Sequence, residues 1–230
     1  MNKPNLDARL LSVEKFVREG AYACDIGTDH AYLPVYLVLT GRALCALASD
    51  INKGPVMRAK ESVAKYGVSD KIEVILSDGL AGAEKYPVTD IIIAGMGGEL
   101  IASILDDAKW TQNEKYRLIL QPMTHAEILR KYLVDNRFSV IDEDIVSEQN
   151  DKKIYQIICA EYSGDADEYT VDELYLGRHN IRKGGEEFVK LCEKLKKINV
   201  EIKRAKESAG QETPSENEII AVAEKYLNAL

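Results

Sequence analysis

The feature that most constrains the fold of this chain is the alternation of short apolar runs with longer helical patterns, from the start to about residue 160. This alternation is typical of a mostly parallel sheet wrapped by helices. Seven runs are predicted as strands, at residues 21–27, 43–50, 71–78, 89–95, 116–122, 139–146 and 153–162. Helices are predicted at residues 33–41, 54–66, 80–85, 98–108 and 125–136. The last two strands have no helix between them, so one strand of this α/β sheet should run antiparallel to the others.

The sequence after this region is helical and poor in strands. A polar stretch at residues 162–170 marks a boundary, so we expect domains at 1–162 and 163–230. Apolar residues spaced alternately three and four apart form a heptad seam: Phe188, Leu191, Leu195, Ile198, Ile202, Ala205 and Ala209. A second helix is indicated by Ile219, Ile220, Ala223, Leu227 and Leu230, after a break at residues 210–214. We expect an antiparallel coiled-coil hairpin within a monomer, and a dimerising coiled coil is the alternative.

The charge of the chain is unevenly distributed. Its net charge of −8 over 230 residues argues against a general nucleic-acid binder. Residues 178–206, however, hold ten basic and four acidic side chains, a local charge of +6, which leaves −14 elsewhere. A solvated helix face is the ordinary explanation for such a stretch. The size of the local excess favours a partner that is an anion.

Cysteine spacing and hydropathy restrict the compartment and the cofactors. The four cysteines lie far apart, without a C-x-x-C pair or a Cys/His cluster, so neither a metal site nor a disulfide framework is expected. They are interpreted as reduced and mostly buried thiols. No run of about 18 apolar residues occurs, and the first 17 residues are amphipathic rather than signal-like. We therefore expect a cytoplasmic protein with no membrane partner.

Acidic residues and glycines stand where the first four predicted strands end. The first strand ends in Asp25 and Gly27, and no G-x-G-x-x-G pattern follows, which disfavours NAD and FAD. Asp50 follows the second strand, where a carboxylate can accept hydrogen bonds from a ribose. An N-cap for the next helix is its alternative role. Asp78 is expected to meet an adenine amino group. Four such strand ends at one edge of the sheet indicate a pocket for S-adenosyl-L-methionine. The expected cofactor-binding residues are Asp25, Gly27, Asp50, Ile51, Asn52, Asp78, Gly79, Ala94 and Gly95.

Five motifs carry a family resemblance: DIGTDHAYLP from Asp25, SDIN from Ser49, SDGL from Ser77, IAGMGGELI from Ile93 and LQPM from Leu120. With these, the chain resembles the bacterial tRNA (adenine(22)-N1)-methyltransferase family, TrmK. The resemblance covers the sheet region, and the helical tail fits the family's two-domain plan. It implies a Rossmann-like class I methyltransferase sheet and methyl transfer from S-adenosyl-L-methionine to adenine N1 in the D-arm region of tRNA, without a metal. Met123 departs from the family pattern, in which Asn follows LQP.

Asp29 is the expected catalytic residue, because methylated adenine is cationic and a carboxylate beside it stabilises the charge or takes an amine proton. Its alternative role is an N-cap. His30 is expected to bond the base or a phosphate, with a structural histidine as the alternative. The expected substrate-binding residues are His30, Met96, Gly97, Gln121, Pro122, Arg182 and Lys183. The GMGG tract also stands where amine-methylating enzymes often carry N/D-P-P-Y/F, which agrees with a ring-nitrogen target.

Two other functions compete with this interpretation. One is a methyltransferase acting on a small molecule or a protein, with the tail as a dimerisation element. The other is an α/β cofactor-binding module that has lost its chemistry and serves as a scaffold for partners. The intact motifs around Asp29 and Gly97 argue against this loss.

Overall fold

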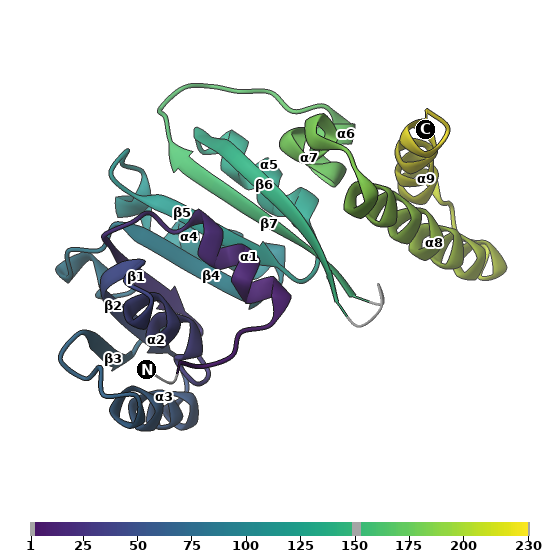
Figure 1. Ribbon diagram of the computed structural model, residues 1–230. Coiled ribbons are helices and arrows are strands. Elements are labelled where there is room, and N and C mark those ends of the chain that lie inside the picture. Colours follow the sequence, from purple (N-terminus) through teal and green to yellow (C-terminus); the bar gives the residue numbers. More distant parts are fainter. Residues whose placement is uncertain (1–2, 149–152, 230) are drawn as a thin grey trace.

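The computed structural model describes residues 3–148 and 153–229 and contains one seven-stranded sheet (Figure 1). Its strand order is β3-β2-β1-β4-β5-β7-β6. The strands are β1 (Ala21–Ile26), β2 (Ala43–Asp50), β3 (Ile72–Leu76), β4 (Asp90–Met96), β5 (Arg117–Pro122), β6 (Phe138–Glu148) and β7 (Lys153–Tyr162). β7 pairs antiparallel with both β5 and β6, while β1 to β5 pair parallel with one another. The predicted strands and the single antiparallel strand are confirmed.

Helices cover both faces of this sheet. They are α1 (Ala8–Phe16), α2 (Tyr32–Leu39), α3 (Lys53–Lys65), α4 (Gly98–Asp107) and α5 (Ala126–Asp135), with short 3-10 turns η1 (Ala83–Lys85) and η2 (Lys109–Thr111). One core cluster joins α1, α2 and α3 to strand residues such as Ala23 and Ile92. A second joins α4 and α5 to Cys24 and Ile91 on the opposite face. Because side chains alternate along a strand, central strands buried on both faces are apolar throughout.

The chain continues into four further helices. They are α6 (Val171–Leu176), α7 (Arg178–Lys183), α8 (Glu186–Ser208) and α9 (Pro214–Leu227). Figure 1 shows α8 and α9 as a pair that extends beyond the sheet. They pack through Phe188, Leu191 and Cys192 of α8 and Val222 and Ala223 of α9, together with Ile145 and Ile154 of the sheet. The predicted pairing of two helices in the tail is therefore confirmed, and the coiled coil stays a prediction.

The predicted heptad seam of α8 is correct only in its first half. Phe188 and Leu191 are buried, whereas Ile198 and Ile202 are each 40% exposed, and Ala205 and Ala209 are also exposed. The reason is that α9 packs on the face of α8 that carries Phe188, Leu191 and Cys192. Ion pairs between Lys196 and Glu224 at 2.9 Å and between Lys206 and Glu216 at 2.6 Å also join the two helices. Leu230 lies outside the described residues.

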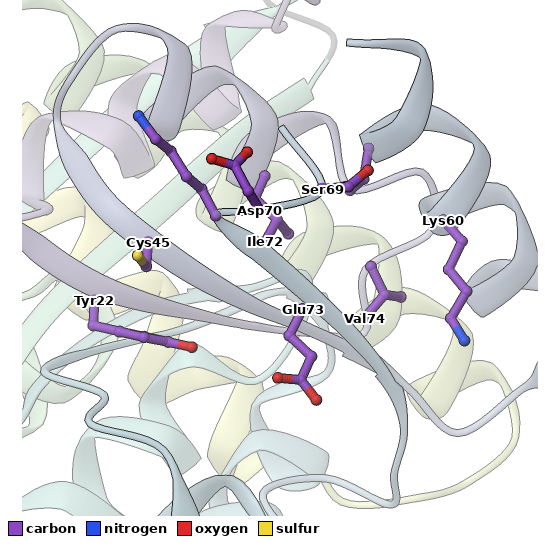
Figure 2. A pocket seen from close by; sticks show the side chains of 10 residues that line it. Tyr22, Cys45, Lys60, Ser69, Asp70, Ile72, Glu73 and Val74 are labelled. Atoms are coloured by element: carbon purple, nitrogen blue, oxygen red, sulfur yellow. The ribbon is translucent and has the colours of Figure 1, made fainter. Parts of the chain in front are cut away.

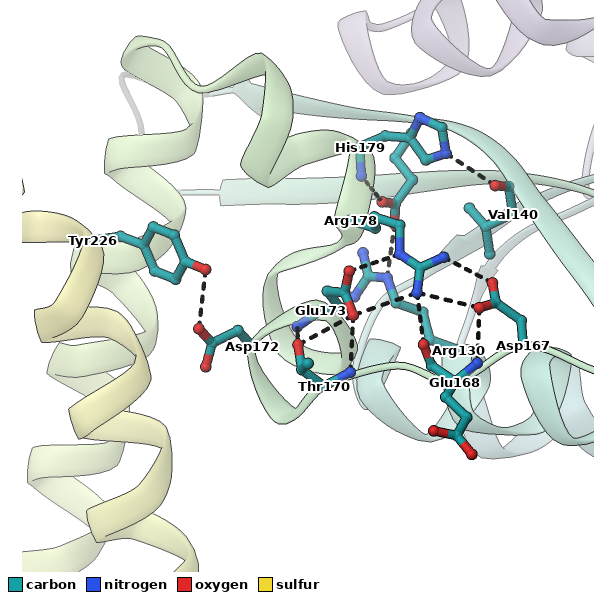
Figure 3. Close-up of polar contacts among 11 residues, drawn as sticks. Arg130, Val140, Asp167, Glu168, Thr170, Asp172, Glu173, Arg178, His179 and Tyr226 are labelled. Carbon is teal, nitrogen blue, oxygen red and sulfur yellow. Dashed lines mark hydrogen bonds and ion pairs between the residues drawn. The ribbon is translucent and has the colours of Figure 1, made fainter.

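A buried ion pair attaches the helices after β7 to the sheet (Figure 3). Arg130 of α5 donates to Glu143 of β6 at 2.7 Å, and both side chains are fully buried. Arg130 also donates to the carbonyl of Leu174, while Glu143 accepts the backbone N–H of His179. A Cβ on Gly177 would lie 2.5 Å from the Glu143 carboxylate, so only glycine fits there. The division at residues 162 and 163 stays a prediction, because α6 and α7 pack against β6 and α5.

The four cysteines are free thiols. Cys24, Cys159 and Cys192 are buried and free, and Cys45 is half-buried, as the sequence predicts. Among residues 3–148 and 153–229, no helix is long and apolar enough to cross a membrane, and no group of three His, Cys, Asp or Glu side chains is arranged to hold a metal ion.

Candidate active site

The ends of β1 to β4 surround a cavity of about 360 Å³. Nine predicted site residues line it: Gly27, Asp50, Ile51, Asn52, Asp78, Gly79, Ala94, Gly95 and Met96. They come together because parallel strands place all their carboxyl ends at one edge, where open α/β sheets bind ligands. Leu100 and Ile104 of α4 also line the cavity. These two residues were not predicted from the sequence, although their spacing of four places them on one helix face.

Asp50 and Asp78 present carboxylate oxygens at this cavity. One Asp50 oxygen accepts the backbone N–H of Asn52 at 2.7 Å, and the other has no partner among the described residues. Asp50 is not the N-cap of α3, because Asn52 occupies that position. The exposed Asp78 side chain has no described partner. Both carboxylates are therefore available as hydrogen-bond acceptors for a ligand.

The glycines around the cavity permit close packing. Gly27 has a φ of +77°, and a Cβ there would lie 2.2 Å from the terminal methyl carbon of Met96. Gly98 begins α4, and a Cβ there would lie 2.1 Å from the carbonyl oxygen of His125. A side chain at Gly98 would push α4 away from the loop after β5, whereas a side chain at Gly27 would displace the end of Met96 and strain the backbone at its positive φ. The GMGG tract is therefore more than a strand-to-helix turn, because Gly98 lets the start of α4 pack directly against the loop after β5.

Asp29 and His30 follow β1 but do not line the cavity. The Asp29 carboxylate is ion-paired with Arg58 of α3, and its other oxygen lies 3.4 Å from the Nε2 of His30. The His30 ring stacks on Tyr32, with ring centroids 5.1 Å apart. Asp29 is not an N-cap, because Ala31 holds that position at the start of α2. Its side chain is 62% exposed, and its catalytic role stays a prediction.

Asp25 lies beneath the site. It is 8% exposed and shares the face of β1 that carries Ala23, toward α1 and α2, and it does not line the cavity. Burial raises the pKa of the Asp25 carboxyl to about 6, while a hydrogen bond from Thr28 and the cation of Arg9 lower it. This environment favours the neutral acid more than water does.

Gln121 is fully buried, and its expected contact with substrate stays a prediction. Its amide oxygen accepts from Arg9 at 2.8 Å and from the Gly95 N–H at 3.0 Å. Its amide nitrogen donates to the Pro122 carbonyl at 2.9 Å. The side chain therefore holds the ends of β4 and β5 in place. The contact with Arg9 was not predicted from the sequence, because its helix lies more than 100 residues from Gln121 along the chain.

The remaining predicted substrate residues are dispersed. Gly97 is the N-cap of α4, and Pro122 is buried at the end of β5. Lys183 of α7 is ion-paired with Asp142 at 2.6 Å, so its charge is already balanced. Arg182 is exposed and has no partner among the described residues. Neither α7 residue lines the cavity.

A larger hollow of about 460 Å³ lies at the opposite edge of the sheet (Figure 2). It is lined by residues from the beginnings of β1, β2 and β3, among them Tyr22, Cys45 and Glu73. The amino ends of parallel strands are not where such sheets bind cofactors. The smaller cavity at the carboxyl ends is therefore the candidate active site.

Comparisons with known proteins agree with this geometry. The protein family described as "Methyltransferase domain" matches residues 6–158. The tRNA (adenine(22)-N(1))-methyltransferase of Bacillus subtilis is 45% identical over 167 residues, which cover 73% of this chain and 69% of that protein. The chain belongs to this methyltransferase family.

Solved structures extend the similarity of this tRNA methyltransferase family member to the tail. The crystal structure of B. subtilis TrmK has a TM-score of 0.80 and 33% identity, covering 97% of this chain and 96% of the other. A Streptococcus pneumoniae protein in complex with S-adenosyl-L-methionine has a TM-score of 0.85 and 32% identity, covering 96% and 99%. The predicted Rossmann-like class I sheet is confirmed.

Proposed function

We infer that this chain transfers the methyl group of S-adenosyl-L-methionine to N1 of adenine 22 in tRNA. The observation that carries this function is the 45% identity to the B. subtilis enzyme of that activity, over a segment as long as the whole sheet region. The geometry of the strand ends supports it, because all the predicted cofactor residues except Asp25 line one cavity.

The residues of the cavity fit this cofactor. Asp50 has a carboxylate oxygen without a described partner, which suits a ribose hydroxyl. Asp78 offers a second acceptor for an adenine amino group. Gly27 and Gly95 both have positive φ angles, and neither places a side chain in the cavity that it lines. When bound, the cofactor supplies an electrophilic methyl group on a sulfonium.

The chain's own contribution to catalysis is mostly positioning. Adenine N1 has a lone pair at neutral pH, so the protein has to hold that atom in line and exclude water. Gln121 and Arg9 keep the ends of β4 and β5 fixed while this happens. We assign to Asp29 the stabilisation of the positive charge that develops on the base, with Arg58 and His30 holding its carboxylate.

We also propose how the whole chain works. Residues 163–230 contact the tRNA, with the exposed Arg182 as one phosphate contact, while residues 1–162 hold the cofactor. The protein acts as a monomer in the cytoplasm. The pairing of α8 with α9 supports the monomer, because the hairpin buries Val222 and Ala223 within one chain.

A cofactor titration tests the assigned pocket. We expect Asp50→Ala to weaken S-adenosyl-L-methionine binding by about 10- to 100-fold in calorimetry, because a hydrogen bond to a charged group contributes about 1.5–3 kcal/mol. Asp70→Ala is the matched control, since Asp70 lines the hollow at the opposite edge of the sheet. Equal affinities of the two variants would place the cofactor elsewhere.

A further inference from the structure

A second hollow, here called the hairpin groove, separates the β5–α5 loop from α8 and α9. It encloses about 320 Å³. Its apolar wall includes Met123 of the loop and Leu195, Ile198 and Ile202 of α8. Met123 is 50% exposed, and Ile198 and Ile202 are each 40% exposed. These isoleucines belong to the seam that α9 leaves uncovered, so the groove exposes apolar surface that no described element covers.

The groove adjoins the candidate active site. The backbone N–H of Met123 donates to the carbonyl of Met96 at 2.8 Å. Met123 lines the groove and Met96 lines the cofactor cavity. A backbone hydrogen bond therefore joins a lining residue of one hollow to a lining residue of the other. A polymer held in the groove passes next to the place where methyl transfer occurs.

Unpaired cations border the groove. Of the ten basic residues at 178–206, six form ion pairs with carboxylates: Arg178, Lys183, Lys190, Lys196, Lys203 and Lys206. Within residues 3–148 and 153–229, no ion pair involves Lys194, Lys197 or Arg204. At 100° per residue, these three fall within an arc of about 80° on α8. Ile198 and Ile202 occupy the adjacent arc, so a basic stripe runs beside the apolar wall.

Lys194 is the cation inside the groove. Its Nζ donates to the backbone carbonyl of Ile154 at 2.9 Å, and burial lowers the pKa of this lysine. The carboxylate of Glu127 also lines the groove, but it lies 3.1 Å from the Nδ1 of His125. A half-buried ammonium without a carboxylate partner is costly, and an anionic ligand offsets that cost.

Building on the proposed function, we propose that the hairpin groove binds one nucleotide of the tRNA, with its base against Ile198 and Ile202 and its phosphate at Lys194. A nucleotide combines a flat apolar face with an anionic group, which is the pairing that the groove presents. A second copy of this chain fits less well, since two α8 helices would bring Lys194, Lys197 and Arg204 against their like charges.

The test measures tRNA affinity as a function of salt, by fluorescence anisotropy with an unmodified transcript and the full-length protein. We expect the double variant Ile198→Ala/Ile202→Ala to weaken binding about tenfold at every salt concentration, because apolar contact area is lost. Lys194→Ala should lower the slope of log affinity against log salt concentration by about 1, because one phosphate contact is lost. Affinity for S-adenosyl-L-methionine should not change in either variant.

Matched controls separate this proposal from a general effect of charge or exposure. Lys196→Ala removes an ion-paired lysine of the same helix, and Ile128→Ala truncates an isoleucine of α5 that is 38% exposed but does not line the groove. Neither should change tRNA affinity or its salt slope. A photoreactive p-benzoylphenylalanine in place of Ile202 should also cross-link to tRNA, which checks the contact without relying on loss of binding.

Three outcomes overturn the proposal. If the groove variants bind tRNA as the parent does and no cross-link forms, the groove is not a nucleotide site although the methyltransferase function stands. If light scattering shows a parent dimer that the double variant dissociates while keeping its tRNA affinity, the groove is an interface between copies. If the parent protein itself does not methylate tRNA, the proposed function fails, and the groove assignment fails with it.

Discussion

Asp25 and Asp29 lie four residues apart near the end of β1, in opposite environments. Asp25 is 8% exposed, whereas the Asp29 side chain is 62% exposed and paired with Arg58. The sequence predicts that both belong to the site, because Asp25 is at the end of a buried strand and Asp29 is in the turn that follows it. It does not predict that one lies beneath the cavity and the other beside it, since strand periodicity does not describe the turn that follows. Arg58 and Arg9 come from distant helices, and no local pattern indicates their contacts.

Asp29→Ala tests the catalytic assignment. We expect kcat for tRNA methylation to fall by at least about 100-fold, because the charge developing on the base loses its carboxylate. Affinity for S-adenosyl-L-methionine should be unchanged in calorimetry. Arg58→Ala should lower kcat by a smaller factor, because it frees the carboxylate from its ion pair but keeps its charge. If Arg58→Ala lowers kcat as much as Asp29→Ala does, Asp29 acts only by holding α3, and the assignment is wrong.

Asp25 makes stability depend on pH. Burial raises its pKa from 3.8 to about 6, so between these values the folded protein binds more protons than the unfolded chain. The free energy of unfolding therefore falls as the pH rises from about 4 to 6, by about 3 kcal/mol for this group. Asp25→Asn removes this dependence. Urea unfolding of both proteins at several pH values measures it, and a parent-to-variant difference that stays constant with pH would refute it.

At the scale of elements, the strands and the α8–α9 pair were predictable, but the face of α8 that contacts α9 was not. Buried parallel strands and amphipathic helices have distinct periods, so their positions follow from the sequence. The heptad spacing indicates an apolar stripe but does not identify its partner. The buried contacts of Phe188, Leu191 and Cys192 with Val222 and Ala223 define the side on which α9 packs, and Ile202 stays exposed. The pairing of Arg130 with Glu143 was also missed, because a single polar residue in a helix has no periodic signal.

The Arg130–Glu143 pair fixes α6 and α7 on the sheet. We expect Arg130→Ala to lower the free energy of unfolding by about 3–5 kcal/mol, because it leaves the Glu143 carboxylate buried without its cation. Lys131→Ala, next to it in α5, removes only the exposed pair with Asp135 and should cost less than about 1 kcal/mol. Urea unfolding measures both. Similar losses in the two variants would show that the buried pair does not anchor these helices.

At the scale of the whole molecule, the positive charge that remains available to a partner is smaller than the composition indicates, because many cations form ion pairs. The stretch at 178–206 carries +6 by composition, yet most of its cations are paired within the protein. Those left unpaired lie mainly along α8, beside the hairpin groove. Sequence could predict the basic stretch and the edge of the sheet where the cofactor residues gather. It could not predict which cations stay available, because pairing depends on elements that meet only in the folded chain.

The most direct test of the central claim is to incubate the protein with labelled S-adenosyl-L-methionine and an unmodified tRNA transcript, then map the labelled nucleoside. We expect labelled 1-methyladenosine at position 22, and no label in a matched transcript that carries guanosine there. Label at another nucleotide, or no incorporation by the folded protein with cofactor bound, would contradict it.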